Sequence, residues 1–91
     1  QCDAIISALP EKVHISFDID GLEPTLCPNT GTPVPGGLQF EEATYLLSRL
    51  AASGKKIIGF DLVEVAPGAH DEWDANVGAR LLYHLCGILA K

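Results

Sequence analysis

Three acidic residues of this sequence have types and spacings suited to chemistry. Asp18 and Asp20 lie two positions apart at the end of an alternating run, and Glu64 lies near the end of an apolar run. Side chains two residues apart in a strand share a face, with Cα atoms about 6.5–7 Å apart. Two carboxylates this close both stay ionised when a cation lies between them, and Mg²⁺ or Mn²⁺ takes such ligands. The spacing therefore favours a metal site; a pair that only caps the Gly21 turn is the open alternative.

The segments that must position these residues have clear patterns. Residues 12–19 alternate apolar and polar side chains, which predicts a strand with two different faces. Residues 56–65 form an apolar run typical of a buried strand that is covered on both faces. The intervening residues 21–38 contain four prolines and four glycines, so neither a helix nor a regular strand ladder can run through them. A long, stiff loop is expected there.

Two helices complete the order of elements. Residues 40–53 repeat apolar side chains at helical spacing, and Gly54 is placed to end that helix. Asp71 can cap a last helix with one apolar stripe, formed by Val77, Leu81, Leu82, Leu85, Ile88 and Leu89. The order strand, loop, helix, strand, helix predicts an α/β fold with parallel strands. Ligands of such sheets bind at the carboxyl ends of the strands, where all three acidic residues are expected to converge.

Three motifs give the sequence a family resemblance. They are S-F-D-I-D-G-L-E-P at 16–24, T-G-T-P-V-P-G-G-L at 30–38 and D-L-V-E-V-A-P at 61–67. In this order they closely resemble the ureohydrolase family, the arginases and agmatinases. The resemblance implies a three-layer α/β/α fold with a mainly parallel sheet. Because the sequence begins at Gln1 and contains no methionine, we expect residues 1–91 to be a single C-terminal fragment of a ureohydrolase domain.

The same resemblance implies a function for the parent protein, namely metal-dependent hydrolysis of a guanidino substrate to urea and an amine. Asp18 would bridge two Mn²⁺ ions and Asp20 would bind one of them. Glu64 would hold the substrate guanidinium as the catalytic carboxylate, and Thr32 would line the substrate pocket. A metal pair lowers the pKa of water, and an ionised carboxylate can hold a planar cation through paired hydrogen bonds.

The family's other metal ligands come from an upstream G-G-x-H segment and an upstream D-x-H-x-x-x-D segment, and this sequence contains neither. Two carboxylates are too few for a metal pair, so the isolated chain is expected to lack turnover. The substrate stays open between arginine and agmatine: the G-L-E-P turn is more arginase-like and the V-A-P turn more agmatinase-like, and we favour arginase. The resemblance also implies a homo-oligomeric parent, a trimer or hexamer.

Composition narrows the other possibilities. Six Lys and Arg against twelve Asp and Glu give a net charge of −6, which disfavours nucleic acid as a partner. The sequence contains no apolar run of the roughly 20 residues that a membrane span needs. Its three cysteines form no Cys-x-x-Cys pair, so a reducing cytoplasm is the expected location.

Two alternatives from other classes compete with the hydrolase. I-S-F-D-I-D-G also resembles the nucleophile motif of haloacid-dehalogenase-type phosphatases, but that function needs a downstream Lys and a paired acidic motif, and it leaves residues 30–38 unexplained. A non-catalytic, self-associating module is the second alternative.

Four further side chains have simpler expected roles. His14 lies about 13 Å along the strand from Asp18 and is expected to be structural. Asp61, inside an apolar run, needs a hydrogen-bond partner. Trp73 is expected to anchor a core or an interface, and His84 to be a packing or surface residue.

Overall fold

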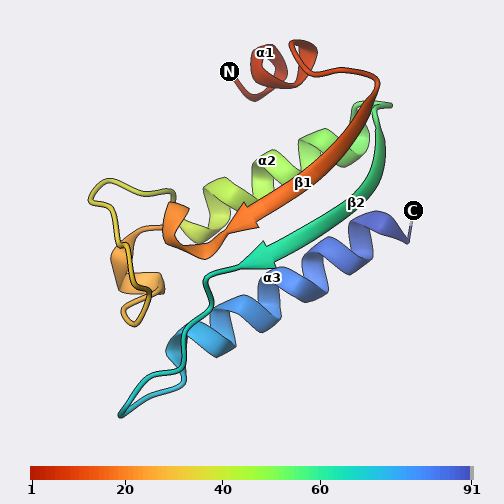
Figure 1. The fold of residues 1–91 in the computed structure, drawn as a ribbon. Helices are drawn as coiled ribbons and strands as arrows, with labels where there is room; N and C mark the ends of the chain where they lie inside the picture. The colour runs from red at the N-terminus through yellow and green to blue at the C-terminus, as the bar shows by residue number, and fades with distance from the viewer. Residues whose placement is uncertain (91) are drawn as a thin grey trace.

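A computed structural model describes residues 1–90 of the chain. Its elements, in order, are α1 (Cys2–Ser7), β1 (Lys12–Asp18), the 3₁₀ turns Ile19–Gly21 and Pro24–Leu26, α2 (Phe40–Ala52), β2 (Lys56–Val63) and α3 (Trp73–Leu89). The predicted order is thus confirmed, with one short N-terminal helix added (Figure 1). Among these residues, no helix combines the length and apolar content that a membrane-spanning segment needs.

The two strands pair in parallel through the α2 crossover, as predicted. Ser16 is opposite Asp61 and Phe17 is opposite Leu62, while an extra residue in β2, Ile58, shifts the register near the start of the pair. Both strands run in the same direction in Figure 1, so their carboxyl ends lie at one edge of the sheet. This topology brings the ends of residues 12–18 and 56–63 together.

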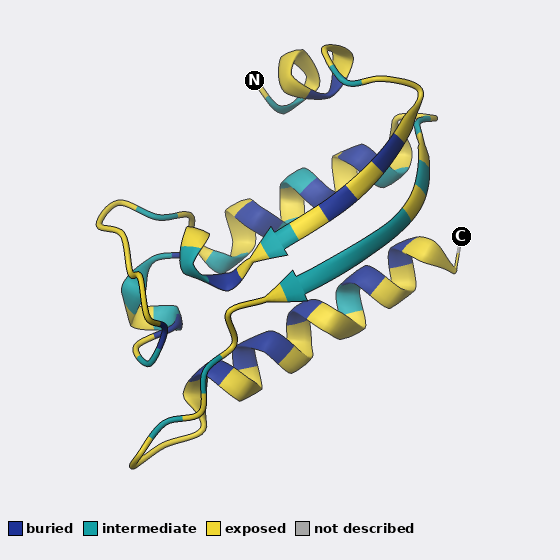
Figure 2. Ribbon diagram, viewed as in Figure 1, coloured by how far each residue is buried: buried dark blue, intermediate teal, exposed yellow. Residues whose placement is uncertain are grey.

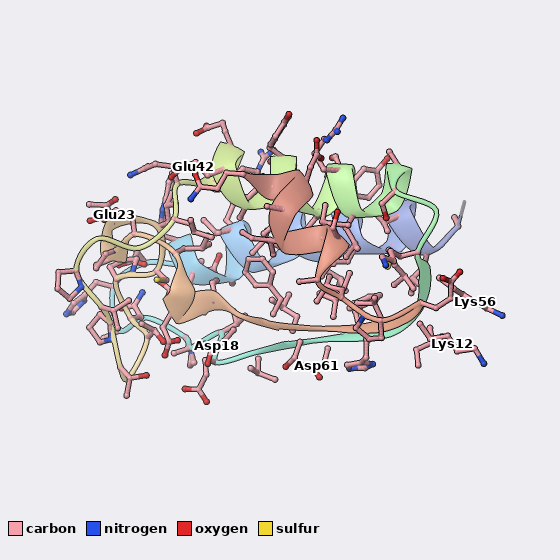
Figure 3. All side chains as sticks on the ribbon, turned by 90° about the horizontal axis from the view of Figure 1, so that it is seen from above. Lys12, Asp18, Glu23, Glu42, Lys56 and Asp61 are labelled. Atoms are coloured by element: carbon pink, nitrogen blue, oxygen red, sulfur yellow. The ribbon has the colours of Figure 1, made fainter. Side chains whose placement is uncertain are left out.

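The helices cover one face of the sheet, as the edge-on view of the sheet in Figure 3 shows. Alternation in β1 directs Val13 and Ile15 toward them, and both side chains are buried. A first core cluster joins α1, β1, α2 and α3 through Ile6, Val13, Ile15, Leu47, Leu50, Leu85 and Ile88. A second cluster anchors the start of the long loop on α2 and α3 through Ile19, Leu22, Cys27, Ala43, Val77 and Leu81. The buried stripe of each helix therefore faces the sheet or this loop (Figure 2).

The opposite face of the sheet is open within residues 1–90. Ile58 is 60% exposed and Val63 is 41% exposed, and most other residues of β2 are only half-buried. The prediction of a strand covered on both faces is therefore wrong for this part of the chain. The described residues supply a parallel sheet and one layer of helices, which confirms the α/β class.

Several local predictions need correction. β1 ends at Asp18 rather than at residue 19, so Asp20 lies in the following 3₁₀ turn and not on the strand. β2 ends at Val63, which leaves Glu64 just beyond it. Residues 21–38 contain a second 3₁₀ turn, and a bridge between residues 22 and 38 closes the loop. Trp73 is 52% exposed, so it is not part of the core.

Candidate active site

Asp18 and Asp20 form a compact pair at the end of β1. The Asp18 carboxylate accepts a hydrogen bond from the backbone N–H of Asp20 at 3.1 Å, which stabilises the 3₁₀ turn that follows the strand. The side chain of Ile19, within this turn, is fully buried in the second core cluster and anchors the turn. Asp18 therefore caps this turn, which is the role that the sequence left open as the alternative to a metal site.

The two carboxyl groups shift each other's pKa in opposite directions. The pKa of Asp18 is raised, chiefly because its carboxyl group shares a hydrogen bond with that of Asp20, and also because of a slight loss of hydration and the nearby charges of Asp20 and Glu64. The pKa of Asp20 is lowered, first by the hydrogen bond from the Thr32 hydroxyl and then by the bond to Asp18. Two like charges this close favour a shared proton or a bound cation.

Glu64 follows β2 in an unusual backbone conformation. Its φ is +67°, in the left-handed region that residues with a Cβ seldom adopt. Its backbone carbonyl accepts a hydrogen bond from the Thr30 hydroxyl at 3.3 Å. Glu64 is exposed, and its charge acts on Asp18. The parallel topology therefore brings Asp18, Asp20 and Glu64 to one edge of the sheet, as predicted.

Thr32, which the sequence assigns to the substrate pocket, lies beside the carboxylate pair. Its hydroxyl donates to Oδ2 of Asp20. Thr32 is exposed, whereas Thr30 two positions earlier is buried. The loop therefore presents one threonine to the acidic pair and the other to the backbone of Glu64.

A buried carboxylate that the sequence did not predict, Asp74, lies in the first turn of α3. Asp74 is fully buried, and both of its oxygens accept hydrogen bonds from the Asn29 backbone N–H at 3.2 Å. Its Oδ1 also accepts from the Asn29 side-chain amide at 2.9 Å. A signal was present in the sequence, because Asp74 precedes Val77 and Leu81 by three and seven residues and so lies on the apolar stripe. Its partner Asn29 lies 45 residues away, so no local sequence pattern indicates the pair.

The donor set fits a divalent cation in part. Paired, exposed carboxylates with a raised pKa at Asp18 are hard oxygen ligands whose mutual repulsion a cation would relieve. Within residues 1–90, however, no three His, Cys, Asp or Glu side chains are arranged to hold a metal ion. A metal ion held by Asp18 and Asp20 would therefore need further ligands from outside these residues.

A second polar cluster lies on the open face of the sheet. The Ser16 hydroxyl donates to Oδ1 of Asp61 at 2.8 Å, and His14 Nε2 lies 3.1 Å from Oδ2. These bonds lower the pKa of Asp61, with His14 as the larger cause. Figure 3 shows Asp61 on the side of the strands away from the helices. Asp61 thus has the partner that the sequence requires, and His14 has the expected structural role.

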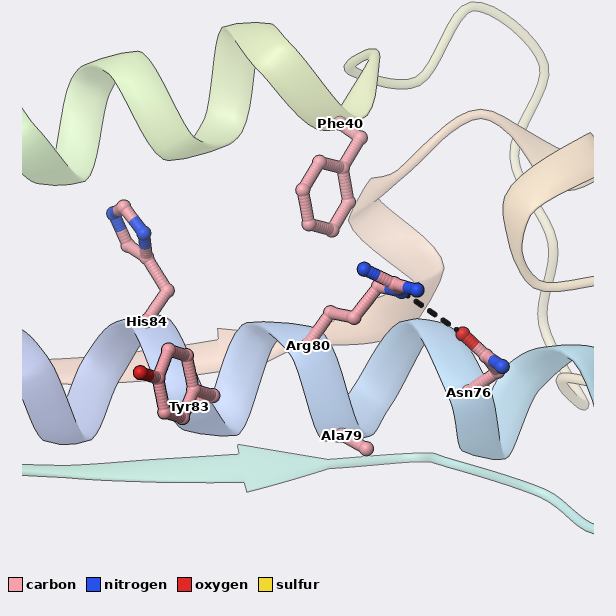
Figure 4. A pocket seen from close by; sticks show the side chains of 6 residues that line it. All are labelled: Phe40, Asn76, Ala79, Arg80, Tyr83 and His84. Atoms are coloured by element: carbon pink, nitrogen blue, oxygen red, sulfur yellow. Dashed lines mark hydrogen bonds between the residues drawn. The ribbon is translucent and has the colours of Figure 1, made fainter.

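A groove between α2 and α3 has none of Asp18, Asp20 and Glu64 in its lining (Figure 4). It is lined by Phe40, Asn76, Ala79, Arg80, Tyr83 and His84. Arg80 donates to the Asn76 side chain at 3.1 Å, and His84 lies 3.4 Å from the Ser48 hydroxyl of α2. The first bond lies within α3, the second contact joins α3 to α2, and none of the residues that line the groove carries a carboxylate. His84 is the packing and surface residue that the sequence predicts.

Comparisons with known proteins point to one family. The family model of the Arginase family matches residues 1–87. The chain is 41% identical over 88 residues to N(1)-aminopropylagmatine ureohydrolase of Thermus thermophilus, covering 94% of this chain and 29% of that protein. It is 45% identical over 80 residues to the mitochondrial arginase-2 of Bos taurus, covering 87% of this chain and 22% of that protein.

Solved structures agree with the sequence comparisons. Proclavaminate amidino hydrolase from Streptomyces clavuligerus superposes with a TM-score of 0.84 at 34% identity, covering 98% of this chain and 30% of that one. Arginase from Entamoeba histolytica, in complex with L-ornithine, superposes with a TM-score of 0.76 at 30% identity, covering 94% of this chain and 31% of that one. The chain thus spans less than a third of the length of these relatives.

Proposed function

The chain belongs to the arginase family, and we propose that it supplies part of the active site of a metal-dependent ureohydrolase. In this proposal the parent protein hydrolyses a guanidino substrate to urea and an amine. The observation that carries it is the convergence of Asp18, Asp20 and Glu64 at one edge of a parallel sheet. That edge is where ligands of α/β folds bind.

Asp18 and Asp20 would hold the metal, which we propose to be a pair of Mn²⁺ ions completed by ligands from outside this chain. Bound divalent ions would supply the Lewis acidity that makes water nucleophilic near neutral pH. Asp18, last in β1, would lie between the two ions, and Asp20 would contact one of them. The Thr32 hydroxyl would help to orient the Asp20 carboxylate, because it donates a hydrogen bond to Oδ2.

Glu64 would bind the substrate rather than the metal. An ionised carboxylate accepts hydrogen bonds through both oxygens, which matches the two parallel N–H groups along one side of a guanidinium. Its exposure leaves it free to do so. Holding the planar cation beside Asp18 would fix the orientation of the guanidinium carbon, which is the positioning part of catalysis.

The substrate class rests on the names of the relatives, which include arginase, agmatinase and N(1)-aminopropylagmatine ureohydrolase. All three names imply a guanidino group, and they differ at the other end of the substrate. The phosphatase alternative is not favoured, because the Arginase family model spans residues 1–87 and includes the loop that alternative left unexplained.

A direct test uses the full-length parent protein loaded with Mn²⁺. Urea release from arginine, agmatine and 4-guanidinobutyrate is measured beside release of phosphate from p-nitrophenyl phosphate. The proposal expects urea from at least one guanidino compound and no phosphate release. A parent that releases phosphate and no urea would refute it.

A further inference from the structure

We propose that Asp74 is a positioning residue that acts through residues 29–32 to set the placement of Glu64 relative to Asp20. The proposal deepens the function above and rests on it, because Asp20 and Glu64 have no separate roles without a guanidino substrate and a metal. The hydrogen bonds of Asp74 go to neither Asp20 nor Glu64. Asp74 acts instead on residues 29–32, which bond to both of them.

The first step is the bond between Asp74 and Asn29. Asp74 is fully buried, and a buried carboxylate is costly unless hydrogen bonds satisfy it. Asn29 supplies them with its backbone N–H at 3.2 Å and its side-chain amide at 2.9 Å. An acidic residue in the first turn of a helix commonly caps its own helix. The hydrogen bonds that Asp74 accepts come instead from Asn29, 45 positions away.

Asn29 is held from a second direction by the loop that follows Glu64. Its side-chain amide also donates to Oδ1 of Asp71 at 2.9 Å, and the same oxygen accepts from the backbone N–H of Trp73 at 3.0 Å. Gly68 lies against this amide, since a Cβ at Gly68 would be 2.7 Å from the Asn29 nitrogen. The position of Asn29 is thus fixed by α3 and by the segment that leads into it.

Thr30 and Thr32, which follow Asn29, link it to the acidic site. Thr30 is buried and donates to the carbonyl of Glu64, whose left-handed φ needs support from its surroundings. Thr32 donates to Asp20. Two residues of chain span at most about 7 Å, so the stretch between the two threonines has little slack. A shift at Asn29 must therefore move the contact to Glu64, the contact to Asp20, or both.

The test uses the full-length parent and a set of reciprocal substitutions. In Asp74→Asn, one accepting oxygen becomes an NH₂ group that can face the amide of Asn29, so donor opposes donor. Asn29 also donates to Asp71, so a carboxylate at position 29 would face the Asp71 carboxylate. The triple variant Asp74→Asn, Asn29→Asp and Asp71→Asn therefore exchanges donor and acceptor in both side-chain bonds of residue 29. We expect Asp74→Asn to lower kcat per bound metal pair about 10- to 100-fold, the scale of a misplacement near 1 Å. The triple variant should recover most of that loss.

A second pair of variants, at Thr30, tests the proposal if Asp74→Asn fails to fold. Thr30→Val removes the hydroxyl that bonds to Glu64 while keeping the shape of the side chain, and Thr30→Ser keeps the hydroxyl. Thr30→Val should lose more activity per bound metal than Thr30→Ser. Ser48→Ala removes a hydroxyl between α2 and α3, far from this contact, and should leave activity unchanged.

Two readouts separate positioning from plain stability. Bound metal should stay at the wild-type level in Asp74→Asn, and amide hydrogen exchange in residues 64–68 should become faster. Unchanged exchange there, unchanged kcat per bound metal, or no recovery in the triple variant would overturn the proposal. A wild-type parent that releases no urea would instead overturn the proposed function, while the exchange measurement would still decide whether Asp74 holds the Glu64 segment.

Discussion

Gly37 offers a sharp test of how the loop between β1 and α2 closes. At this position the chain passes directly against the backbone of residue 22, so an added Cβ would overlap the carbonyl group of Leu22 and lie 2.7 Å from the nitrogen of Glu23. Two backbone hydrogen bonds meet at this point. Glu23 donates to the Leu38 carbonyl at 2.8 Å, and Leu38 donates to the Gly21 carbonyl at 3.0 Å.

Gly37→Ala must therefore move the two chain segments apart. Each backbone hydrogen bond contributes a net stability of about 0.5–1.5 kcal/mol, so losing both should cost about 1–3 kcal/mol. Gly31→Ala is the matched control, because a Cβ there meets nothing within 4 Å and Gly31 has no positive φ. It should be neutral or slightly stabilising, since alanine restricts the unfolded chain.

The assay is urea-induced unfolding of the full-length parent for wild type and both variants, followed by circular dichroism. The expected result is a lower midpoint for Gly37→Ala and an unchanged or higher midpoint for Gly31→Ala. Equal midpoints for the two variants would refute the reasoning, because they would show that the loop closes without the close approach at Gly37.

Two further predictions concern the core and the open sheet face. Leu81→Ala, at a fully buried position, should lower the free energy of unfolding by about 2–5 kcal/mol. Leu82→Ala, at a neighbour that is 45% exposed, should lower it by less than about 1 kcal/mol. Equal losses of stability in urea unfolding would contradict the assigned burial. The pKa of Asp61 is lowered by His14 and Ser16, so its contribution to stability is present above the unfolded carboxyl pKa and is lost as pH falls through the folded one. His14→Ala should therefore raise the Asp61 pKa measured by carboxyl NMR and shift acid unfolding to higher pH, and an unchanged pKa would count against the bond.

The sequence predicted the order of elements because its periodicities are long and regular. The alternation of residues 12–18 and the apolar stripe of residues 40–52 each repeat several times, and Gly54 ends the second with φ +88°. Helix α1 was not predicted, since its six residues are too few for a pattern to stand out. The burial of β2 was overestimated because an apolar run does not reveal which part of a protein covers it.

The candidate site was predicted by residue type and topology, and its local geometry was not. The crossover rule placed Asp18 and Glu64 at one edge, and the parallel pairing confirms it. The turn that removes Asp20 from the strand and the left-handed Glu64 depend on individual hydrogen bonds. The bond at Asp20 is local, whereas the bonds of Glu64 and Asp74 join residues far apart in the sequence, and none of them leaves a periodic trace.

The central claim, that Asp18 and Asp20 hold metal while Glu64 holds substrate, is tested most directly by measuring bound Mn²⁺ and initial rates together. In the full-length parent, Asp18→Asn should lose metal and activity together, because a neutral amide cannot balance two divalent charges. Asp20→Asn should lose mainly one ion. Glu64→Gln should keep both ions by elemental analysis and still lose most of its turnover. Equal loss of metal in all three variants would contradict this division of roles.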